Sequence, residues 1–223
     1  GVFGTQGMPS PANKPPGLYE PCEWKDNNGN FWLFGGLNIN PGECAALWKY
    51  DPNPLSPTYN QWTWMKGPST INQPGVYGTQ GIPSPANYPG AGAYGAITWT
   101  DASGNLWLFG GFGYDVNGMP GWLNHLWKYD PNPSSPTYNQ WTWMKGPSTI
   151  NQPGVYGTQG IPSPANYPGA RSFGAITWTD ASGNLWLFGG FGVDVNGMNG
   201  VLNDLWKYDI STNEWTWVKG PNT

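Results

Sequence analysis

Ionisable side chains are scarce in this sequence of 223 residues. Only 10% of the residues are charged, against roughly 25% in an ordinary soluble domain. The chain has eight lysines, one arginine (Arg171) and one histidine (His125), and its formal net charge is −4 at pH 7. A chain without a basic stripe cannot neutralise a phosphate backbone, so we expect no nucleic acid as a partner.

Long apolar runs are missing as well. No stretch approaches the roughly 18 apolar residues that a membrane helix needs, and no segment resembling a signal peptide opens the sequence. We therefore expect no membrane span, and either a cytosolic protein or one whose signal was removed before this numbering begins. Low charge and high Asn, Thr and Trp content favour an extracellular or cell-surface location.

Glycine and proline are common, but the aromatic content argues against disorder. The 34 glycines and 24 prolines make 58 of 223 residues, a level near that of low-complexity chains. The 16 Trp, 12 Tyr and 8 Phe supply large apolar groups that can offset the entropy of ordering. Since no stretch has apolar residues at helical spacing over three turns, we expect an all-β chain with almost no helix.

Three copies of one unit make up most of the chain. The motif LWKY begins at Leu47, Leu126 and Leu205, so consecutive copies lie 79 residues apart. The motifs WLFGG and WTW also recur once per copy, the former from Trp32, Trp107 and Trp186 and the latter from Trp62, Trp141 and Trp215. This periodicity divides the chain into units 1–67, 68–146 and 147–223, each with the connector that precedes it.

Each copy predicts four short strands. In copy 3 we place them at 175–178, 185–188, 202–208 and 214–218, with the second ending at the glycine pair and turns between them. Four strands joined by hairpins at a fixed period are typical of propeller blades.

The spacing of the glycine pair, the tyrosine and the tryptophan within a copy resembles a known repeat. Gly189 and Gly190, then Tyr208, then Trp215 after six residues resemble the signature of bacterial-type kelch repeats. The resemblance implies a kelch-like β-propeller with one four-stranded blade per repeat. Copies 1 and 2 depart from it by placing eleven residues between Tyr and Trp, in the enlarged hairpins 51–61 and 130–140.

Three blades do not close a ring. Propellers have about four to eight blades, and an open arc would expose the apolar flanks of its end blades. We therefore expect the arc to be completed by further copies of the chain or by further kelch repeats. The complete assembly is then a ring shared by two chains, an open array of stacked arcs, or a larger parent protein.

The connectors are long. Residues 146–170 repeat 67–91 without change, and 1–16 are a shortened version. We expect a loop ordered by Val155, Tyr156 and Ile161. It either links the fourth strand of one blade to the first of the next, or folds over a propeller face or a neighbouring chain.

Positions that break the repeat are candidates for binding. Trp122 replaces Glu43 of copy 1 and Val201 of copy 3, so it is the best candidate for an exposed aromatic that stacks on a sugar. With Trp122 we group Tyr114 from the loop that precedes it (112–121), together with His125 and Glu43. A glycan- or protein-binding adhesion module is therefore the alternative function. The other repeat-locked tryptophans predict packing between blades.

Metal and catalytic sites have weak support. Asp115 with Asn117, and Asp194 with Asn196, resemble the start of a calcium loop but lack the later Glu, and a tight turn explains them equally. One histidine supports neither a copper site nor a Ser triad. Glutamates peculiar to copy 1 could line one patch, but they do not suffice for a glycosidase: Glu20, Glu23 and Glu43. We expect no cofactor and no enzyme, with an accessory domain of a secreted oxidase or carbohydrate-active enzyme as a remote alternative.

Two cysteines occur, both in copy 1. Cys22 stands where the other copies have Ile, and Cys44 where they have Leu. They form either a disulfide between the first strand and the start of the third, or two buried thiols. Arg171 stands just before a first strand, where kelch-like repeats often have arginine, and this resemblance implies a structural donor to blade carbonyls in preference to a ligand group. The sequence thus favours a non-catalytic scaffold that self-assembles or belongs to a larger extracellular structural protein.

Overall fold

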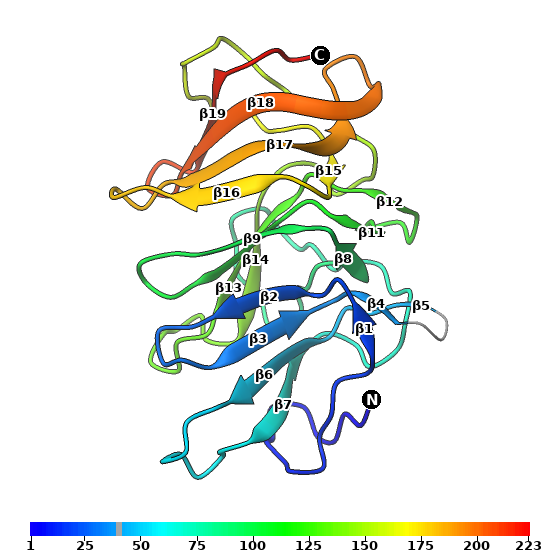
Figure 1. The fold of residues 1–223 in the computed structure, drawn as a ribbon, viewed down its shortest axis with the longest axis vertical. Helices are drawn as coiled ribbons and strands as arrows, with labels where there is room; N and C mark the ends of the chain where they lie inside the picture. The colour runs from blue at the N-terminus through cyan, green and yellow to red at the C-terminus, as the bar shows by residue number, and fades with distance from the viewer. Residues whose placement is uncertain (39–41) are drawn as a thin grey trace.

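The computed structural model describes residues 1–38 and 42–223, and these residues form an all-β molecule (Figure 1). Within this described part of the chain there is no helix, and hence none that could cross a membrane. Three large antiparallel sheets follow one another along the long axis, from sheet 1 near the N-terminus to sheet 3 near the C-terminus (Figure 1).

Each large sheet is a four-stranded meander built from one sequence copy. Sheet 1 consists of β2 (Cys22–Lys25), β3 (Phe31–Phe34), β6 (Leu47–Asp51) and β7 (Gln61–Lys66). Sheet 2 consists of β9 (Ile97–Thr100), β10 (Leu106–Phe109), β13 (Leu126–Asp130) and β14 (Gln140–Lys145). Sheet 3 consists of β16 (Ile176–Thr179), β17 (Leu185–Val193), β18 (Asn199–Asp209) and β19 (Glu214–Lys219), with β15 (Arg171–Ser172) on the far end of β17.

Two small sheets continue the second and third strands of copies 1 and 2. The first contains β1 (Leu18–Tyr19), β4 (Leu37–Asn38) and β5 (Gly42–Glu43), and the second contains β8 (Gly92–Tyr94), β11 (Phe112–Tyr114) and β12 (Pro120–Trp122). In copy 3 the corresponding segments stay in one strand, because the register shifts between Phe188 and Gly190 and the ladder then resumes. The prediction that the second strand ends at the glycine pair is therefore wrong for copy 3, where a bulge keeps the strand continuous.

Hydrogen bonds and aromatic rings join neighbouring sheets at repeated positions. The first strands β2, β9 and β16 lie side by side. The indole Nε1–H of Trp24 donates to the carbonyl of Trp107 at 3.0 Å, and that of Trp99 donates to the carbonyl of Trp186 at 3.2 Å. Four ring pairs follow the same rule, with centroids 5.3–5.6 Å apart: Trp32–Tyr129, Phe34–Trp141, Trp107–Tyr208 and Phe109–Trp215. Two hydrophobic clusters, one at each junction, make the core.

The connectors run along the outermost strand of the sheet that follows them. In each one a glycine N–H donates to the carbonyl of the second Trp of WTW at 2.8 Å, namely Gly7 to Trp64, Gly81 to Trp143 and Gly160 to Trp217. A connector therefore covers the fourth strand of its own copy, which would otherwise be an unpaired edge.

Only one of the three residues expected to order the connector is buried. Tyr156 is buried, whereas Val155 and Ile161 remain exposed. The prediction is wrong for Val155 and Ile161, because backbone hydrogen bonds, and not apolar packing, fix that part of the loop. Val155 pairs with Tyr167 inside the connector, and Gly160 N–H donates to the edge strand.

Candidate functional site

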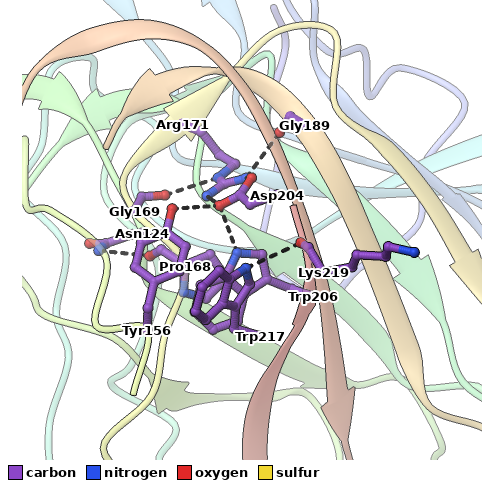
Figure 2. A network of polar contacts seen from close by, with 10 residues as sticks. All are labelled: Asn124, Tyr156, Pro168, Gly169, Arg171, Gly189, Asp204, Trp206, Trp217 and Lys219. Carbon is purple, nitrogen blue, oxygen red and sulfur yellow. Dashed lines mark hydrogen bonds and ion pairs between the residues drawn. The ribbon is translucent and has the colours of Figure 1, made fainter. Parts of the chain in front are cut away.

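A buried polar cluster lies where the third connector meets sheet 3 (Figure 2). The Tyr156 hydroxyl donates to Asp204 Oδ2 at 2.7 Å, and Trp206 Nε1 donates to the same oxygen at 2.7 Å. The Tyr156 ring packs against Trp206 and Trp217, with centroids 4.8 and 5.2 Å apart. The tyrosine is thus held by packing on both sides and by a carboxylate at its tip.

Arg171 completes this cluster. Its guanidinium forms a bidentate ion pair with Asp204, at 2.7 Å from Nη1 to Oδ1 and 2.8 Å from Nη2 to Oδ2. Nε and Nη1 also donate to the carbonyls of Gly169 and Gly189, at 3.1 and 3.0 Å. These bonds confirm the prediction that Arg171 donates to backbone carbonyls.

Burial and charge act in opposite directions on Asp204. Burial alone would raise the pKa of the Asp204 carboxyl, but the Arg171 charge and the hydrogen bonds from Arg171, Trp206 and Tyr156 outweigh it, so the pKa lies below its ordinary value. Both members of the pair are fully buried. A charge pair that is closed to solvent and whose carboxylate oxygens already accept four hydrogen bonds is not accessible to a ligand.

Sheet 2 replaces the carboxylate with a histidine. The Tyr77 hydroxyl lies 2.7 Å from Nδ1 of His125, and the Tyr77 ring packs on Trp127 and Trp143. Burial lowers the pKa of His125 to about 3, so the imidazole is neutral at pH 7. A neutral partner needs no counter-charge, and Gly92 stands where sheet 3 has Arg171.

Sheet 1 removes the polar groups altogether. Phe3 takes the place of the connector tyrosine, and its ring lies 4.9 Å from Trp48 and 5.2 Å from Trp64. Ala46 takes the place of the aspartate and Gly17 that of the arginine. Each copy therefore carries a chemically matched set, and His125, which the sequence marked as a candidate binding residue, is part of a connector anchor.

The other candidate binding residues do not join His125 in one exposed site. Trp122 is half-buried with its ring 5.3 Å from Phe191 of sheet 3, and Tyr114 packs against the core between sheets 1 and 2. Trp122 therefore contributes to a junction between sheets. Comparing the three copies did not indicate that Phe191 contacts Trp122, because the two residues belong to different copies.

Glu43 is buried beside Gly92. Its backbone N–H donates to Asn72 Oδ1 at 2.8 Å, while its carboxyl Oε2 has no hydrogen-bond partner among the described residues. Burial raises the pKa of Glu43 to about 7. A side chain at Gly92 would collide with this carboxyl, since an added Cβ would lie within contact distance of Oε2.

The two loops that resemble calcium sites are turns. Asp115 Oδ1 accepts the backbone N–H groups of Asn117 and Met119, at 2.8 and 2.9 Å. Asp194 Oδ1 accepts those of Asn196 and Met198, both at 2.8 Å. Within residues 1–38 and 42–223, no three His, Cys, Asp or Glu side chains come together as metal ligands.

Both cysteines are buried free thiols, so the structure contains no Cys22–Cys44 disulfide. The Cys22 Sγ–H points to the neighbouring sheet and donates to the Ala93 carbonyl at 3.2 Å. Burial raises the pKa of both thiols, and it is the main cause in each case.

An open cavity of about 440 Å³ lies along the first strands of all three sheets. Glu20, Glu23 and Phe173 contribute to its lining. Glu20 has φ 48° where the other copies have Gly95 and Gly174, so a charged side chain occupies a left-handed position that glycine normally takes. Of the three glutamates grouped from the sequence, Glu20 and Glu23 therefore meet at this cavity, and Glu43 lies elsewhere.

Neither a protein-family model nor a curated protein sequence matches the chain. Among solved structures the chain is similar to YjhT, with a TM-score of 0.51 and 16% sequence identity. The match covers 99% of this chain and 55% of the YjhT chain, so this chain spans about half the length of that protein. At this identity the similarity concerns the fold alone.

Proposed function

We propose that the three large sheets are consecutive four-stranded blades of a kelch-type β-propeller, and that the chain is a non-catalytic scaffold. Its partners are then copies of itself or further repeats, in an extracellular or cell-surface structure. The observation that supports this best is that the polar residues that differ between the copies bind the connectors. His125, Arg171 and Asp204 are all fully buried, so none of them can act on a substrate.

The mass of the native protein tests the scaffold function. Light scattering at micromolar concentration should give a multiple of the 24.3 kDa chain mass, because isolated blades would leave aromatic faces in water. Circular dichroism on the same sample should show a full β spectrum. A folded protein with the mass of a single chain would contradict self-assembly.

A binding function is the second candidate, and the 440 Å³ cavity favours it. Polar groups from Glu20 and Glu23 beside the exposed Phe173 ring suit a glycan, since a sugar offers hydroxyl donors on its edge and an apolar face for stacking. A glycan array with the wild type and Phe173→Ala tests this idea. Binding that Phe173→Ala abolishes and Trp122→Ala preserves would support the cavity over Trp122.

A further inference from the structure

Sheet 3 ends in an aromatic face that the rest of the chain leaves uncovered. Trp99 is 5% exposed because its indole reaches sheet 3, whereas its copy-3 counterpart Trp178 is 49% exposed. Ile176 is 51% exposed where Ile97 is buried. The same face is half-buried at three further positions whose counterparts in sheet 2 are fully buried: Trp186, Phe188 and Leu205.

Sheet 1 ends in the opposite half of the same junction. Phe31 is 45% exposed where Leu106 and Leu185 are fully buried. Tyr50 and Trp62 are half-buried, although their counterparts in sheets 2 and 3 are fully buried by rings of the preceding sheet. Sheet 1 thus presents the residues that accept a preceding sheet, and sheet 3 those that enter a following one.

We propose that the sheet 3 face of one copy docks on the sheet 1 face of a second copy, and that two copies close a ring of six sheets. The new junction continues the two internal ones: Trp178 Nε1–H donates to the carbonyl of Trp32 in the second copy. Trp186 and Phe188 then pack on Tyr50 and Trp62 of that copy. This inference rests on the proposed scaffold function and names its partner and contact surfaces.

The backbone supports the same pairing. At the first internal junction Gly36 N–H donates to the Gly92 carbonyl at 2.7 Å, and at the second Gly111 N–H donates to the Arg171 carbonyl at 2.8 Å. By the repeat, Gly190 N–H and the Gly17 carbonyl of the second copy are the corresponding pair. A second copy thus supplies both the hydrogen-bond acceptors and the aromatic rings that these positions use inside the chain.

The number of sheets favours two copies. Propellers close with about four to eight blades, so one copy has too few blades and three copies would have nine. A head-to-tail contact that closes after two copies has two-fold symmetry, and both junctions of the ring are then identical. Each copy covers the open faces of the other.

Complementary variants test the pairing. Ile176→Arg places a charge on the sheet 3 face, and Phe31→Arg places one on the sheet 1 face. Each variant alone should have the mass of one chain, with the dimer dissociation constant raised roughly thirty-fold or more. Mixing the two variants should restore a heterodimer, because one junction of that pair has no altered face. Ile161→Arg is the matched control, since Ile161 is an exposed isoleucine of the connector and the variant should stay dimeric.

The outcomes separate this inference from the scaffold function. A wild type with twice the chain mass, together with rescue on mixing, supports both. An assembly that persists in Ile176→Arg or Phe31→Arg, or one larger than two chains, leaves the scaffold function standing and overturns the two-copy ring. A wild-type monomer with a full β spectrum overturns the two-copy ring and the self-assembly of the scaffold.

Discussion

The hydroxyl of Tyr156 donates a 2.7 Å hydrogen bond to Asp204, which lies 48 residues further along the chain. This bond ties the third connector to the third strand of sheet 3. In copy 2 the equivalent bond joins Tyr77 and His125 at the same distance, whereas copy 1 has Phe3 and Ala46 at these positions. Each connector is therefore anchored by a different matched pair. The pairs differ in how much stability their disruption should remove.

Removing the Tyr156 hydroxyl should destabilise the protein. Tyr156→Phe leaves the ring packed on Trp206 and Trp217 but removes a donor from a buried carboxylate, so we expect a loss of about 1.5–3 kcal/mol in urea unfolding. Tyr59→Phe is the control, because Tyr59 is exposed in the hairpin 51–61 and should change stability by less than about 0.5 kcal/mol. Equal effects of the two substitutions would contradict the anchor.

Removing one member of the Arg171–Asp204 ion pair should lower the free energy of unfolding more than replacing both members. Arg171→Met leaves the Asp204 carboxylate buried without its counter-charge, and we expect a loss of about 3–5 kcal/mol. The double variant Arg171→Met with Asp204→His imitates the neutral set of copy 2 and should recover a large part of that loss. A double-mutant cycle in urea measures the coupling between the two positions. Additive losses would show that the residues do not act as a pair.

The repeat made the sheets predictable, because WLFGG, LWKY and WTW mark the same strands in all three copies. The turn positions also followed from local chemistry: Asp101 and Asp180 each accept backbone N–H groups within their hairpins. The prediction that Arg171 donates to backbone carbonyls is confirmed by its bonds to Gly169 and Gly189, although the other copies have glycine at this position.

Contacts between distant segments could not be predicted from one copy. Trp122 is predicted to be exposed, yet it is half-buried and its ring lies against Phe191 of the next sheet. The match of Tyr77 with His125 depends on the connector lying on the edge strand, which no local pattern indicates. The continuous β17 likewise depends on a bulge at a glycine pair that separates two strands in the other copies.

The thiols should react only after unfolding. Cys22 and Cys44 are buried, and burial raises the pKa of each thiol, which disfavours the reactive thiolate. Titration with a thiol reagent should therefore detect almost no thiol in the native protein and two per chain in guanidinium chloride without reductant. Two thiols that remain undetected after denaturation would indicate a disulfide and contradict the structure.

The pH dependence of stability should reflect two groups, His125 and Glu43, whose effects on the free energy of unfolding have opposite signs. His125 has a folded-state pKa of about 3 against an ordinary value of 6.5, so the unfolded chain binds the proton more readily and stability is lost as pH falls below 6.5. Glu43 has a folded-state pKa of about 7 against an ordinary value of 4.5. Its contribution is present below pH 4.5 and is lost as pH rises through 7. Between pH 5 and 6.5 the two effects oppose each other in the wild type.

When one of the two groups is replaced, the pH dependence of stability should show the effect of the other group alone. Glu43→Gln keeps a neutral side chain at this position and leaves His125 alone, so the free energy of unfolding should fall by about 1.4 kcal/mol per pH unit between 6.5 and 5. Tyr77→Phe with His125→Ala recreates the apolar set of copy 1, and its stability should rise as pH falls over the same range. Urea unfolding at several pH values measures both slopes. A flat profile for Glu43→Gln would mean that His125 takes up its proton over the same pH range in the folded and the unfolded chain, and would contradict the lowered pKa, because only equal proton binding in both states leaves stability independent of pH.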